Sequence, residues 1–422
     1  MVRRSSQNDP LAAPSRTGTS TVFPDPTPLL VASGLEPEQV VRILGPYGVA
    51  NPAEADTNIQ SMAGEPHTRR LLAAILPRLL AEVARTADPD QALNHWERLF
   101  AGSATRSSLL QYLQASPRML GLLCTIFGNS DSLAFALIRD PMLVYWLAEE
   151  DVLTTAPTRG RMVAALRQSL GSLKATELKL EVLRRVRRRE MLRIGVRDLL
   201  RLATVEETVG SLSDLASILI HAAYEIVDKD LKAQHGSPMH QRADGTWVET
   251  EFVVIGMGKL GAHELNYSSD VDLIYVYALA DGETRKGKGH RQANLEPLSN
   301  EEYFEVLARS LTKALAEQTR EGAVFRVDLR LRAEGSVGQL ARSVQAYAKY
   351  YAQRGQVWER LALLKAWPVA GSPALGQAFV QMAEEFVFQP DPQPLTRERA
   401  LAVIRDVRSV KEMIDEKIAL RG

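Results

Sequence analysis

The sequence predicts a mostly helical α+β protein: a helical bundle, a small α/β domain and a C-terminal helix. Three observations lead to this fold class. Apolar residues recur at the spacing of amphipathic helices through most of residues 29–234. Residues 251–277 instead contain two apolar strands joined by a glycine turn. A last amphipathic helix is predicted over residues 396–420, after three closely spaced prolines that interrupt the chain.

The composition is that of a soluble globular protein. The chain has 422 residues, with 51 basic and 51 acidic side chains, 45% hydrophobic residues and 24% charged residues. Its zero net charge argues against a general nucleic-acid-binding or membrane-binding surface, and no apolar run reaches the length of a membrane span. Arg3 and Arg4 are not followed by an apolar segment of the kind found in export signals, so we expect a cytoplasmic protein.

Composition and periodicity divide the chain into four parts. We predict a disordered tail at residues 1–28, a helical domain at 29–235, an α/β domain at 236–388 and a C-terminal helix at 389–422 that opens a truncated helical domain. Residues 234–248 contain two glycines and a proline and are expected to form a linker into the α/β domain.

The helical domain is expected to consist of several packed hairpins. Apolar spacing predicts helices at residues 68–87, 91–100, 107–127 and 132–147. A helix boundary is expected at Asp140-Pro141, because the residue before a proline disfavours the helical conformation. The single cysteine, Cys124, excludes a disulfide framework and is expected to be a buried core thiol.

An arginine-rich segment occupies residues 180–200. It contains Arg184, Arg185, Arg187, Arg188, Arg189, Arg193 and Arg197. Taken singly, each is best interpreted as part of a solvated helical face with acidic partners such as Glu190 and Asp198. The alternative is a stripe that faces phosphate or a partner. Among seven arginines, we expect at least one to meet an anion.

Two aspartates open the second strand of the glycine-turn segment. Asp270 and Asp272 are two residues apart, so their side chains project to the same face of a strand. Adjacent carboxylates repel each other unless a cation lies between them, and hard oxygen ligands suit Mg²⁺. The pair therefore predicts a metal-dependent site for phosphoryl or nucleotidyl transfer.

A later strand is predicted at residues 323–331, where apolar and charged side chains alternate. Its charged face carries Asp328, the natural third carboxylate beside Asp270 and Asp272. Arg330 and Arg332 on the same face could neutralise phosphate oxygens. The alternative is that Asp328 pairs with its arginine neighbours on an exposed face.

The glycine turn has two competing interpretations. Gly256, Gly258 and Gly261 spell the G-x-G-x-x-G pattern of dinucleotide-binding proteins, which requires a helix and then an acidic residue about 20 positions later. Only nine positions separate Gly261 from Asp270, so that helix does not fit. We favour a turn whose peptide N–H groups, together with Lys259, contact phosphate. A tight strand connection without a ligand is the simpler alternative.

The rest of the α/β domain contributes a loop and two helical segments. Residues 281–297 are polar and basic and are predicted to form a mobile lid near the active face. Ser299 and Glu302 have the spacing of a capping box at the start of the next helix. A further helix is predicted within residues 347–371, from which Lys365 could reach phosphate or simply extend along the surface.

These features together resemble the nucleotidyltransferase superfamily, which has a DNA polymerase β-like fold. More closely, GMGKLGAHELNYSSDVDLIYVY (residues 256–277) and VFRVDLRLRAEG (residues 324–335) resemble the glutamine synthetase adenylyltransferase/adenylyl-removing family. Residues 126–147, 183–200 and 357–371 support the same resemblance. Members of this family carry two similar halves. The sequences of residues 265–272 and 407–414 look like the N-terminal, adenylyl-removing half, so we expect the chain to hold that half alone.

The resemblance implies that phosphate attacks the adenylyl-tyrosine of glutamine synthetase and releases ADP in a Mg²⁺-dependent reaction. It assigns Mg²⁺ to Asp270, Asp272 and Asp328, and phosphate or nucleotide contacts to Gly258, Lys259, Gly261, Ser269, Arg330, Arg332 and Lys365. Glutamine synthetase and the PII signalling protein are the implied partners. Adenylylation from ATP and a catalytically weak regulatory fragment remain as alternatives. The chain departs from the family pattern at Ala333, Trp367 and Ser372, where Pro, Arg and Asp are usual.

Overall fold

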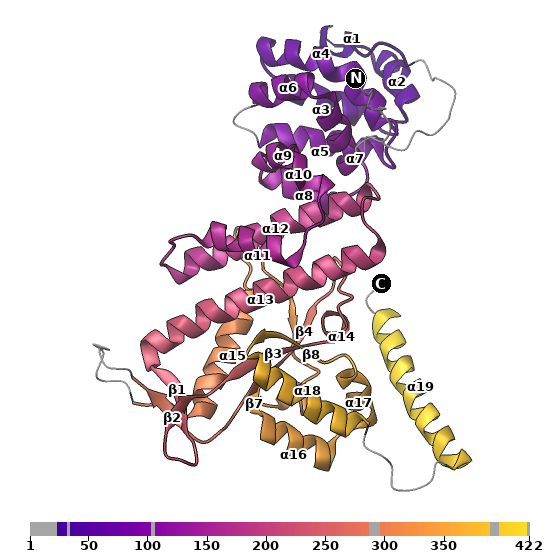
Figure 1. Ribbon diagram of the computed structural model, residues 1–422. Helices are drawn as coiled ribbons and strands as arrows, with labels where there is room; N and C mark the ends of the chain where they lie inside the picture. The colour runs from indigo at the N-terminus through magenta and orange to yellow at the C-terminus, as the bar shows by residue number, and fades with distance from the viewer. Residues whose placement is uncertain (1–22, 32–33, 103–105, 287–295, 389–395, 420–422) are drawn as a thin grey trace, which may run out of the picture. The chain divides into compact units, whose positions relative to one another are not determined.

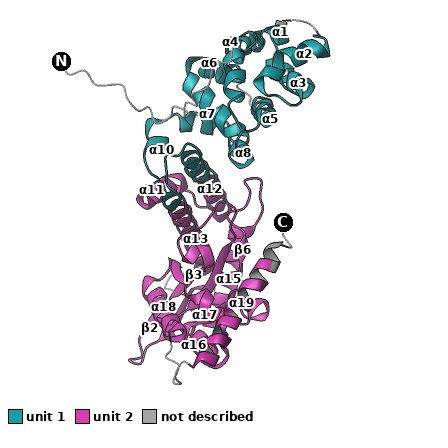
Figure 2. Ribbon diagram, turned by 90° about the vertical axis from the view of Figure 1, so that its right-hand side faces the viewer, with its two compact units in different colours: residues 1–157, 188–208 teal, residues 158–187, 209–422 magenta. Residues whose placement is uncertain are grey.

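The computed structural model describes residues 23–31, 34–102, 106–286, 296–388 and 396–419 (Figure 1). This part of the chain is mostly helical and contains two small sheets, so the predicted α+β class is confirmed. Two compact units are present (Figure 2): unit 1 comprises residues 1–157 and 188–208, and unit 2 comprises residues 158–187 and 209–422. Helix α12 (Thr176–Leu199) contributes to both, so the units do not end where the predicted domains do.

Unit 1 is a bundle of short helices, many of which begin at a proline. Proline suits the first helical position because its fixed φ is helical and the N–H it lacks would have no partner there. In α5, for example, Pro89 follows Asp88, whose side chain accepts a hydrogen bond from the Gln91 N–H at 2.9 Å. The elements are α1 (Pro28–Val31), α2 (Pro37–Leu44), η1 (Gly45–Tyr47), α3 (Pro52–Ala63), α4 (Pro66–Val83), α5 (Pro89–Ala101), α6 (Arg106–Ala115), α7 (Pro117–Phe127), α8 (Asp131–Arg139), α9 (Met142–Leu147), α10 (Glu150–Thr154) and the C-terminal part of α12.

Two proline positions decide how the predicted helices divide. The single helix expected at residues 107–127 is wrong, because Pro117 ends α6 and begins α7. Proline inside a helix would remove a hydrogen bond and clash with the preceding turn. The boundary expected at Asp140-Pro141 is confirmed, since it separates α8 from α9.

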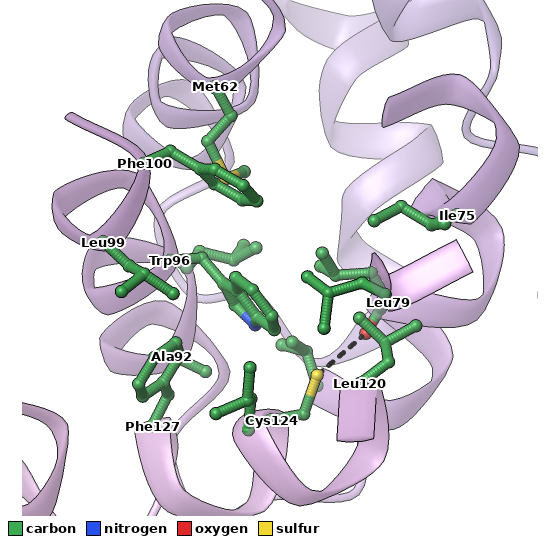
Figure 3. Packing of buried hydrophobic residues seen from close by; sticks show 14 of the residues in the cluster. Met62, Ile75, Leu79, Ala92, Trp96, Leu99, Phe100, Leu120, Cys124 and Phe127 are labelled. Atoms are coloured by element: carbon green, nitrogen blue, oxygen red, sulfur yellow. Dashed lines mark hydrogen bonds between the residues drawn. The ribbon is translucent and has the colours of Figure 1, made fainter. Parts of the chain in front are cut away.

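The core of unit 1 is apolar and tightly packed around Trp96 (Figure 3). Trp96 stacks on Phe100 at 5.7 Å and meets the edge of Phe127 at 5.0 Å between ring centroids. Cys124 is fully buried beside them, and its thiol donates to the Leu79 carbonyl at 3.8 Å. Burial raises the pKa of this thiol to about 12. The prediction of a buried core thiol is therefore confirmed.

Unit 2 contains both sheets and the helices that cover them. Its elements are α11 (Arg159–Leu170), the N-terminal part of α12, α13 (Val205–His235) from Val209 onward, β1 (Ser237–Gln241), β2 (Trp247–Glu249), β3 (Phe252–Met257), α14 (Gly258–Gly261), β4 (Val271–Tyr277), β5 (Glu283–Arg285), α15 (Asn300–Ala316), β6 (Val327–Asp328), η2 (Gly335–Val337), β7 (Ala341–Ser343), α16 (Val344–Arg354), α17 (Val357–Leu363), β8 (Trp367–Gly371), α18 (Pro373–Val387) and α19 (Arg397–Ala419).

The larger sheet has the strand order β6-β4-β3-β8, and β7 pairs with β4 further along the same strand. Strand β3 is antiparallel to β4 and β8, whereas β6 and β7 run parallel to β4. The smaller sheet has the order β2-β1-β5 and is antiparallel. Every residue of β3 is buried, as expected for a central strand that is covered on both faces.

Different helices cover the two faces of the larger sheet. On one face, Phe252 stacks on Phe304 of α15 at 5.6 Å and on Tyr224 of α13 at 5.4 Å. The Tyr275 hydroxyl on this face lies 2.9 Å from that of Thr312, also in α15. The other face packs against α16 and α18 (Figure 1) through a shared apolar cluster. Its buried members include Val253, Ile255, Ile274, Val276, Tyr347, Tyr351 and Phe379.

The predicted linker at residues 234–248 is wrong, because it contains strand β1 and the start of β2 in an antiparallel hairpin. The turn between them contains Asp244 and Gly245, a dipeptide that is typical of hairpins. The Asp244 carboxylate accepts a hydrogen bond from the Thr246 N–H at 2.9 Å, and Gly245 has a φ of 85°. The Asp244-Gly245 dipeptide is visible in the sequence and is stronger evidence for a hairpin than the glycine and proline content of the segment is for a linker.

The strand predicted at residues 323–331 is much shorter than expected. Of these residues, only Val327 and Asp328 form a strand, β6, and they pair with the first two residues of β4. Before it, the N–H groups of Val324 and Phe325 both donate to the Leu315 carbonyl and therefore do not join a ladder. After it, Glu334 and Gly335 adopt positive φ values of 62° and 58° and turn the chain. Alternation alone does not make a strand where no neighbouring strand is available.

The helix predicted within residues 347–371 is interrupted twice. Helix α16 ends before Gly355, where a Cβ atom would lie 2.3 Å from the ring of Phe386, and α17 follows. Lys365 lies beyond the end of α17, and the chain then enters β8. The predicted lid at residues 281–297 includes strand β5, while its residues 287–295 lie outside the described residues.

Two other predicted helices are confirmed. The capping box of α15 forms as expected: the Ser299 hydroxyl accepts from the Glu302 N–H at 3.2 Å, and the Glu302 carboxylate accepts from the Ser299 N–H at 2.9 Å. Helix α19 covers the predicted C-terminal segment and exposes Leu401, Ile404 and Val407. Among the described residues, no helix is long and apolar enough to cross a membrane.

The prediction that the arginines of α12 form a solvated helical face is wrong for three of them. Arg184, Arg193 and Arg197 are buried, with exposed fractions of 3%, 6% and 6%. Their long stems pack like apolar side chains while the guanidinium groups find protein acceptors. Arg184 pairs with Glu181 at 3.1 Å, Arg193 pairs with the expected partner Glu190, and Arg197 donates to the Leu202 carbonyl at 3.0 Å.

Candidate functional site

Three aspartates lie at one end of the larger sheet. Asp272 of β4 lies directly opposite Asp328 of β6 in the parallel register. Asp270 immediately precedes β4, whose first residue, Val271, donates its N–H to the Arg326 carbonyl at 2.9 Å. The structure therefore brings together the three aspartates that the sequence pattern selected. Their assignment as metal ligands remains a prediction.

Asp272 has the most perturbed environment of the three carboxylates. Burial is the largest cause that raises its pKa, to about 6, and the negative charges of Asp328 and Asp270 add to this effect. The positive charges of Arg330 and Lys259 act in the opposite direction but are weaker. A nearby cation would stabilise the charged form of this half-buried carboxylate.

Arginines provide the positive charge for the other two carboxylates. The Arg326 Nε atom donates to Asp270 Oδ1 at 2.5 Å, and its Nη2 atom donates to the Ser268 carbonyl at 2.6 Å. The Arg330 Nε atom lies 3.0 and 2.8 Å from the two carboxylate oxygens of Asp328, and this pairing raises the pKa of Arg330. The alternative interpretation, in which Asp328 pairs with an arginine neighbour, is therefore what the structure shows for Arg330.

The donor chemistry of the three aspartates suits a hard divalent cation such as Mg²⁺. Within the described residues, however, no group of three His, Cys, Asp or Glu side chains is gathered closely enough to hold a metal ion. Coordination by all three would require Arg326 and Arg330 to release Asp270 and Asp328. The side chains of both arginines are largely exposed, at 70% and 58%, and can move into solvent.

The glycine turn is shaped by close backbone approaches. Gly258 has a φ of 55°, and a Cβ atom there would lie 2.6 Å from Asp272 Oδ2. At Gly261 a Cβ atom would lie 1.7 Å from the Lys365 carbonyl oxygen. Glycine is therefore required at Gly258 to admit the carboxylate and at Gly261 to admit the chain before β8. Packing alone accounts for Gly261, whereas Gly258 touches the carboxylate group directly.

The other predicted binding residues differ in their surroundings. Lys259 is exposed in the glycine turn, close enough for its charge to lower the pKa of Asp272. The Ser269 hydroxyl donates to the Asn266 side chain at 2.5 Å, and the Lys365 ammonium pairs with Glu264. Arg332 is buried and donates to the backbone carbonyls of Leu329, Ser336, Gly338 and Gln339. Ser269, Arg332 and Lys365 are thus engaged with protein groups.

Arg326 is the residue of this region that the site prediction omitted. It lies on the same charged face of the predicted strand as Asp328, two residues earlier, and it binds Asp270. The signal was available in the sequence, but the short β6 could not be anticipated. Because β6 begins only at Val327, the Arg326 side chain is free to reach across to the residue that precedes β4.

A separate cavity of about 270 Å³ in unit 2 contains none of the predicted site residues. Tyr224 and Phe252 form part of its wall, and Asp228, Lys232 and Glu249 provide charges. Lys232 pairs with Asp228 at 2.5 Å and with Glu249 at 2.6 Å. Because Lys232 is already paired with both Asp228 and Glu249, we place the candidate site at the carboxylates.

Comparisons with known proteins show what the chain is similar to. Residues 120–382 match the family model described as glutamate-ammonia ligase adenylyltransferase. The chain is similar to the bifunctional glutamine synthetase adenylyltransferase/adenylyl-removing enzyme of Nitrosococcus oceani, with 37% identity over 72% of this chain and 30% of that protein. It is 36% identical to the enzyme of the same name from Pseudomonas aeruginosa, over 76% of this chain and 32% of that protein.

A third similar protein, from Corynebacterium glutamicum, has the same name and is 29% identical over 92% of this chain and 35% of its own length. The chain thus spans about a third of the length of these curated relatives. The family match includes α14, β4 and β6, and therefore all three carboxylates.

Proposed function

Because the chain belongs to the glutamate-ammonia ligase adenylyltransferase family, we propose that it removes AMP from adenylylated glutamine synthetase by phosphorolysis. The observation that carries the proposal is the carboxylate group itself, in which Asp272 faces Asp328 across two parallel strands. The direction of the reaction is supported by the sequence of residues 265–272, which resembles the adenylyl-removing half of the family.

The proposed reaction exchanges one phosphorus–oxygen bond for another. An oxygen of inorganic phosphate bonds to the α-phosphorus of the adenylyl-tyrosine, and the bond from that phosphorus to the tyrosyl oxygen breaks. The products are ADP and a tyrosine whose oxygen takes up a proton. Phosphate is itself the nucleophile, so the protein has to position the reactants and compensate charge rather than form a covalent intermediate.

We assign Asp270, Asp272 and Asp328 as the oxygen ligands of a Mg²⁺ ion. When bound, such an ion supplies positive charge to the phosphate oxygens and to the leaving tyrosyl oxygen. Gly258 leaves room for the Asp272 carboxylate, and the exposed Lys259 adds positive charge at the same turn. Arg330, now paired with Asp328, would gain a phosphate oxygen as its new partner when the carboxylate turns to the metal ion.

The proposed setting is the cytoplasm, with glutamine synthetase as the protein substrate. The single cysteine is a buried thiol, which is compatible with a reducing compartment. A regulatory interaction with the PII signalling protein rests on the family resemblance alone.

The decisive experiment measures ADP release from adenylylated glutamine synthetase in the presence of Mg²⁺ and inorganic phosphate. The Asp270→Asn/Asp272→Asn double variant is the control, since it keeps the size of both side chains and removes their charge. We expect ADP release that depends on phosphate and is absent from the double variant.

Two further arms test the alternatives. Incorporation of AMP from ATP into unmodified glutamine synthetase would favour adenylyl transfer, which the same carboxylates could support. Binding of glutamine synthetase without turnover in either direction would favour a regulatory fragment and would overturn the proposed activity.

A further inference from the structure

Arg187 differs from its neighbours in α12 because it lacks an anionic partner among the described residues. Arg184 pairs with Glu181 at 3.1 Å, and Arg185 pairs with Glu321 at 3.3 Å. The Arg187 guanidinium instead lies over the ring of Phe325, 5.2 Å from its centroid. Its Nε atom is buried without a hydrogen-bond partner, as are those of Arg184 and Arg193, but these two arginines each pair with a carboxylate. Burying an uncompensated cation is costly, so such a position calls for a ligand.

A second positive charge makes this situation less favourable. After burial, the positive charge of Arg326 is the cause that lowers the pKa of Arg187. Arg326 directly follows Phe325, and its guanidinium holds Asp270 at 2.5 Å. Because Arg187 lies over the ring of the residue before Arg326, two arginines from segments far apart in the sequence lie in the same region of unit 2, and one of them holds Asp270. Like charges in proximity repel, and an anion shared between them would remove the repulsion.

We propose that Arg187 and Arg326 form a phosphate-binding subsite next to the carboxylates. The planar guanidinium group matches the oxygens of a phosphate better than a lysine does, and stacking on Phe325 fixes the orientation of Arg187. The ligand is a phosphate group with at least two free oxygens, either inorganic phosphate or the terminal phosphate of a nucleotide. The role of the subsite as the binding place of the attacking phosphate rests on the proposed function.

The subsite would be linked to cation binding through Arg326. This side chain neutralises Asp270 in the structure and is 70% exposed. A cation that binds Asp270 would displace Arg326, and the displaced guanidinium group would then be able to bind a phosphate. Each ligand should therefore increase the affinity for the other.

The test measures binding directly, with inorganic phosphate, AMP and ADP titrated into the full chain by calorimetry, with and without Mg²⁺. Arg187→Gln is compared with the parent and with Arg185→Gln, a control that removes an exposed arginine from the same helix. We expect Arg187→Gln to weaken phosphate binding roughly 10- to 100-fold, the range for losing charge-assisted hydrogen bonds. Arg185→Gln should stay within about twofold of the parent.

The three ligands identify the source of the phosphate. A loss confined to inorganic phosphate assigns the subsite to the free anion. A loss for ADP that is not seen for AMP assigns it to a terminal nucleotide phosphate. Equal affinities in the parent and Arg187→Gln, or a parent that binds none of the ligands, would overturn the proposal. If Arg187→Gln does not fold, Arg187→Met, which keeps an apolar side chain beside Phe325 and removes the charge, takes its place, and unchanged binding by that variant would equally overturn the proposal.

The binding experiment also separates this subsite from the proposed activity. A chain that binds phosphate through Arg187 but releases no ADP would disprove the phosphorolysis and leave the subsite standing. A chain that releases ADP with the same KM for phosphate in the parent and Arg187→Gln would disprove the subsite alone.

Discussion

Burial has opposite consequences in two regions of the chain, the core around Trp96 and the carboxylate group around Asp272. In the core, Trp96, Phe100 and Phe127 are fully buried against one another. His95 is a buried polar neighbour there, and its ring lies within hydrogen-bonding distance of the Phe127 carbonyl, at 2.9 Å. At the end of the sheet, by contrast, burial and neighbouring carboxylates raise the pKa of Asp272 to about 6.

This difference indicates where stability and function are located in the chain. Apolar packing around Trp96 lowers the free energy of the folded state and requires no ligand. The carboxylate group retains a charge conflict that Arg326 and Arg330 only partly relieve. Residues held together against their mutual repulsion are typical of functional sites. Substitutions in the two regions should therefore have separable effects on stability and activity.

The largest expected effect is the loss of activity in Asp272→Asn. Removing one charged ligand from the proposed metal site should lower phosphorolysis at least roughly a thousandfold, because a bound cation contributes several kcal/mol to charge stabilisation. Thermal stability should be unchanged or slightly higher. Initial rates of ADP release and melting curves would be measured together. Asp244→Asn, in the exposed β1–β2 turn, is the control, and a rate for Asp272→Asn within a few-fold of it would disprove the assignment.

The opposite pattern is expected for Trp96→Ala. Truncating this fully buried ring should destabilise the protein by about 3–5 kcal/mol, as large-to-small substitutions in cores do. Denaturant unfolding would measure the loss, and Mg²⁺ affinity in native buffer should be retained. Val41→Ala removes a side chain that is 53% exposed and should change stability by less than about 0.5 kcal/mol. Equal losses for the two variants would contradict the packing argument.

The same contrast explains which features the sequence predicted. Helices with an apolar stripe, the capping box of α15 and the buried Cys124 follow from local pattern and were correctly anticipated. Asp270 and Asp272 were selected from their spacing and Asp328 from the charged face of the later predicted strand, and the structure places Asp272 opposite Asp328. Such features depend on a residue and its neighbours in sequence.

Features that depend on distant segments were missed. The alternation of apolar and charged residues predicted a strand over residues 323–331. The length of the strand depends on where β4 begins, so only the two residues of β6 pair with it. The arginines of α12 were predicted to form a solvated face, because a pattern of charges along the sequence does not reveal which elements will cover them. Arg184 is buried through contacts with carbonyls about 130 residues later in the chain. Partners at that separation are not readable from one sequence.

Substitution of two glycines in unit 2 by alanine should have smaller effects, which differ between the two positions. Gly258 and Gly245 both have positive φ, at 55° and 85°, but only Gly258 lies against a carboxylate. Gly245→Ala should cost about 1 kcal/mol from backbone strain, whereas Gly258→Ala should cost about 1–3 kcal/mol and also weaken Mg²⁺ binding. Chemical denaturation and metal titration of both variants would check this. Equal metal affinities would indicate that the Asp272 carboxylate does not need the space at Gly258.

The smallest expected effect is a pH dependence of stability caused by Asp272. Its pKa is about 6 in the folded chain and 3.8 ordinarily, so between these pH values the folded state binds more protons than the unfolded state. The contribution of this carboxyl to stability therefore falls as pH rises through the window. Asp272→Asn lacks the titration, so its stability relative to the parent should increase from pH 4 to pH 6.5 when divalent ions are chelated. Because Asp272 is only half-buried, solvent screening keeps the effect small. Parallel curves for the two proteins would contradict the electrostatic conflict, whereas a difference that disappears on adding Mg²⁺ would show that a cation resolves it.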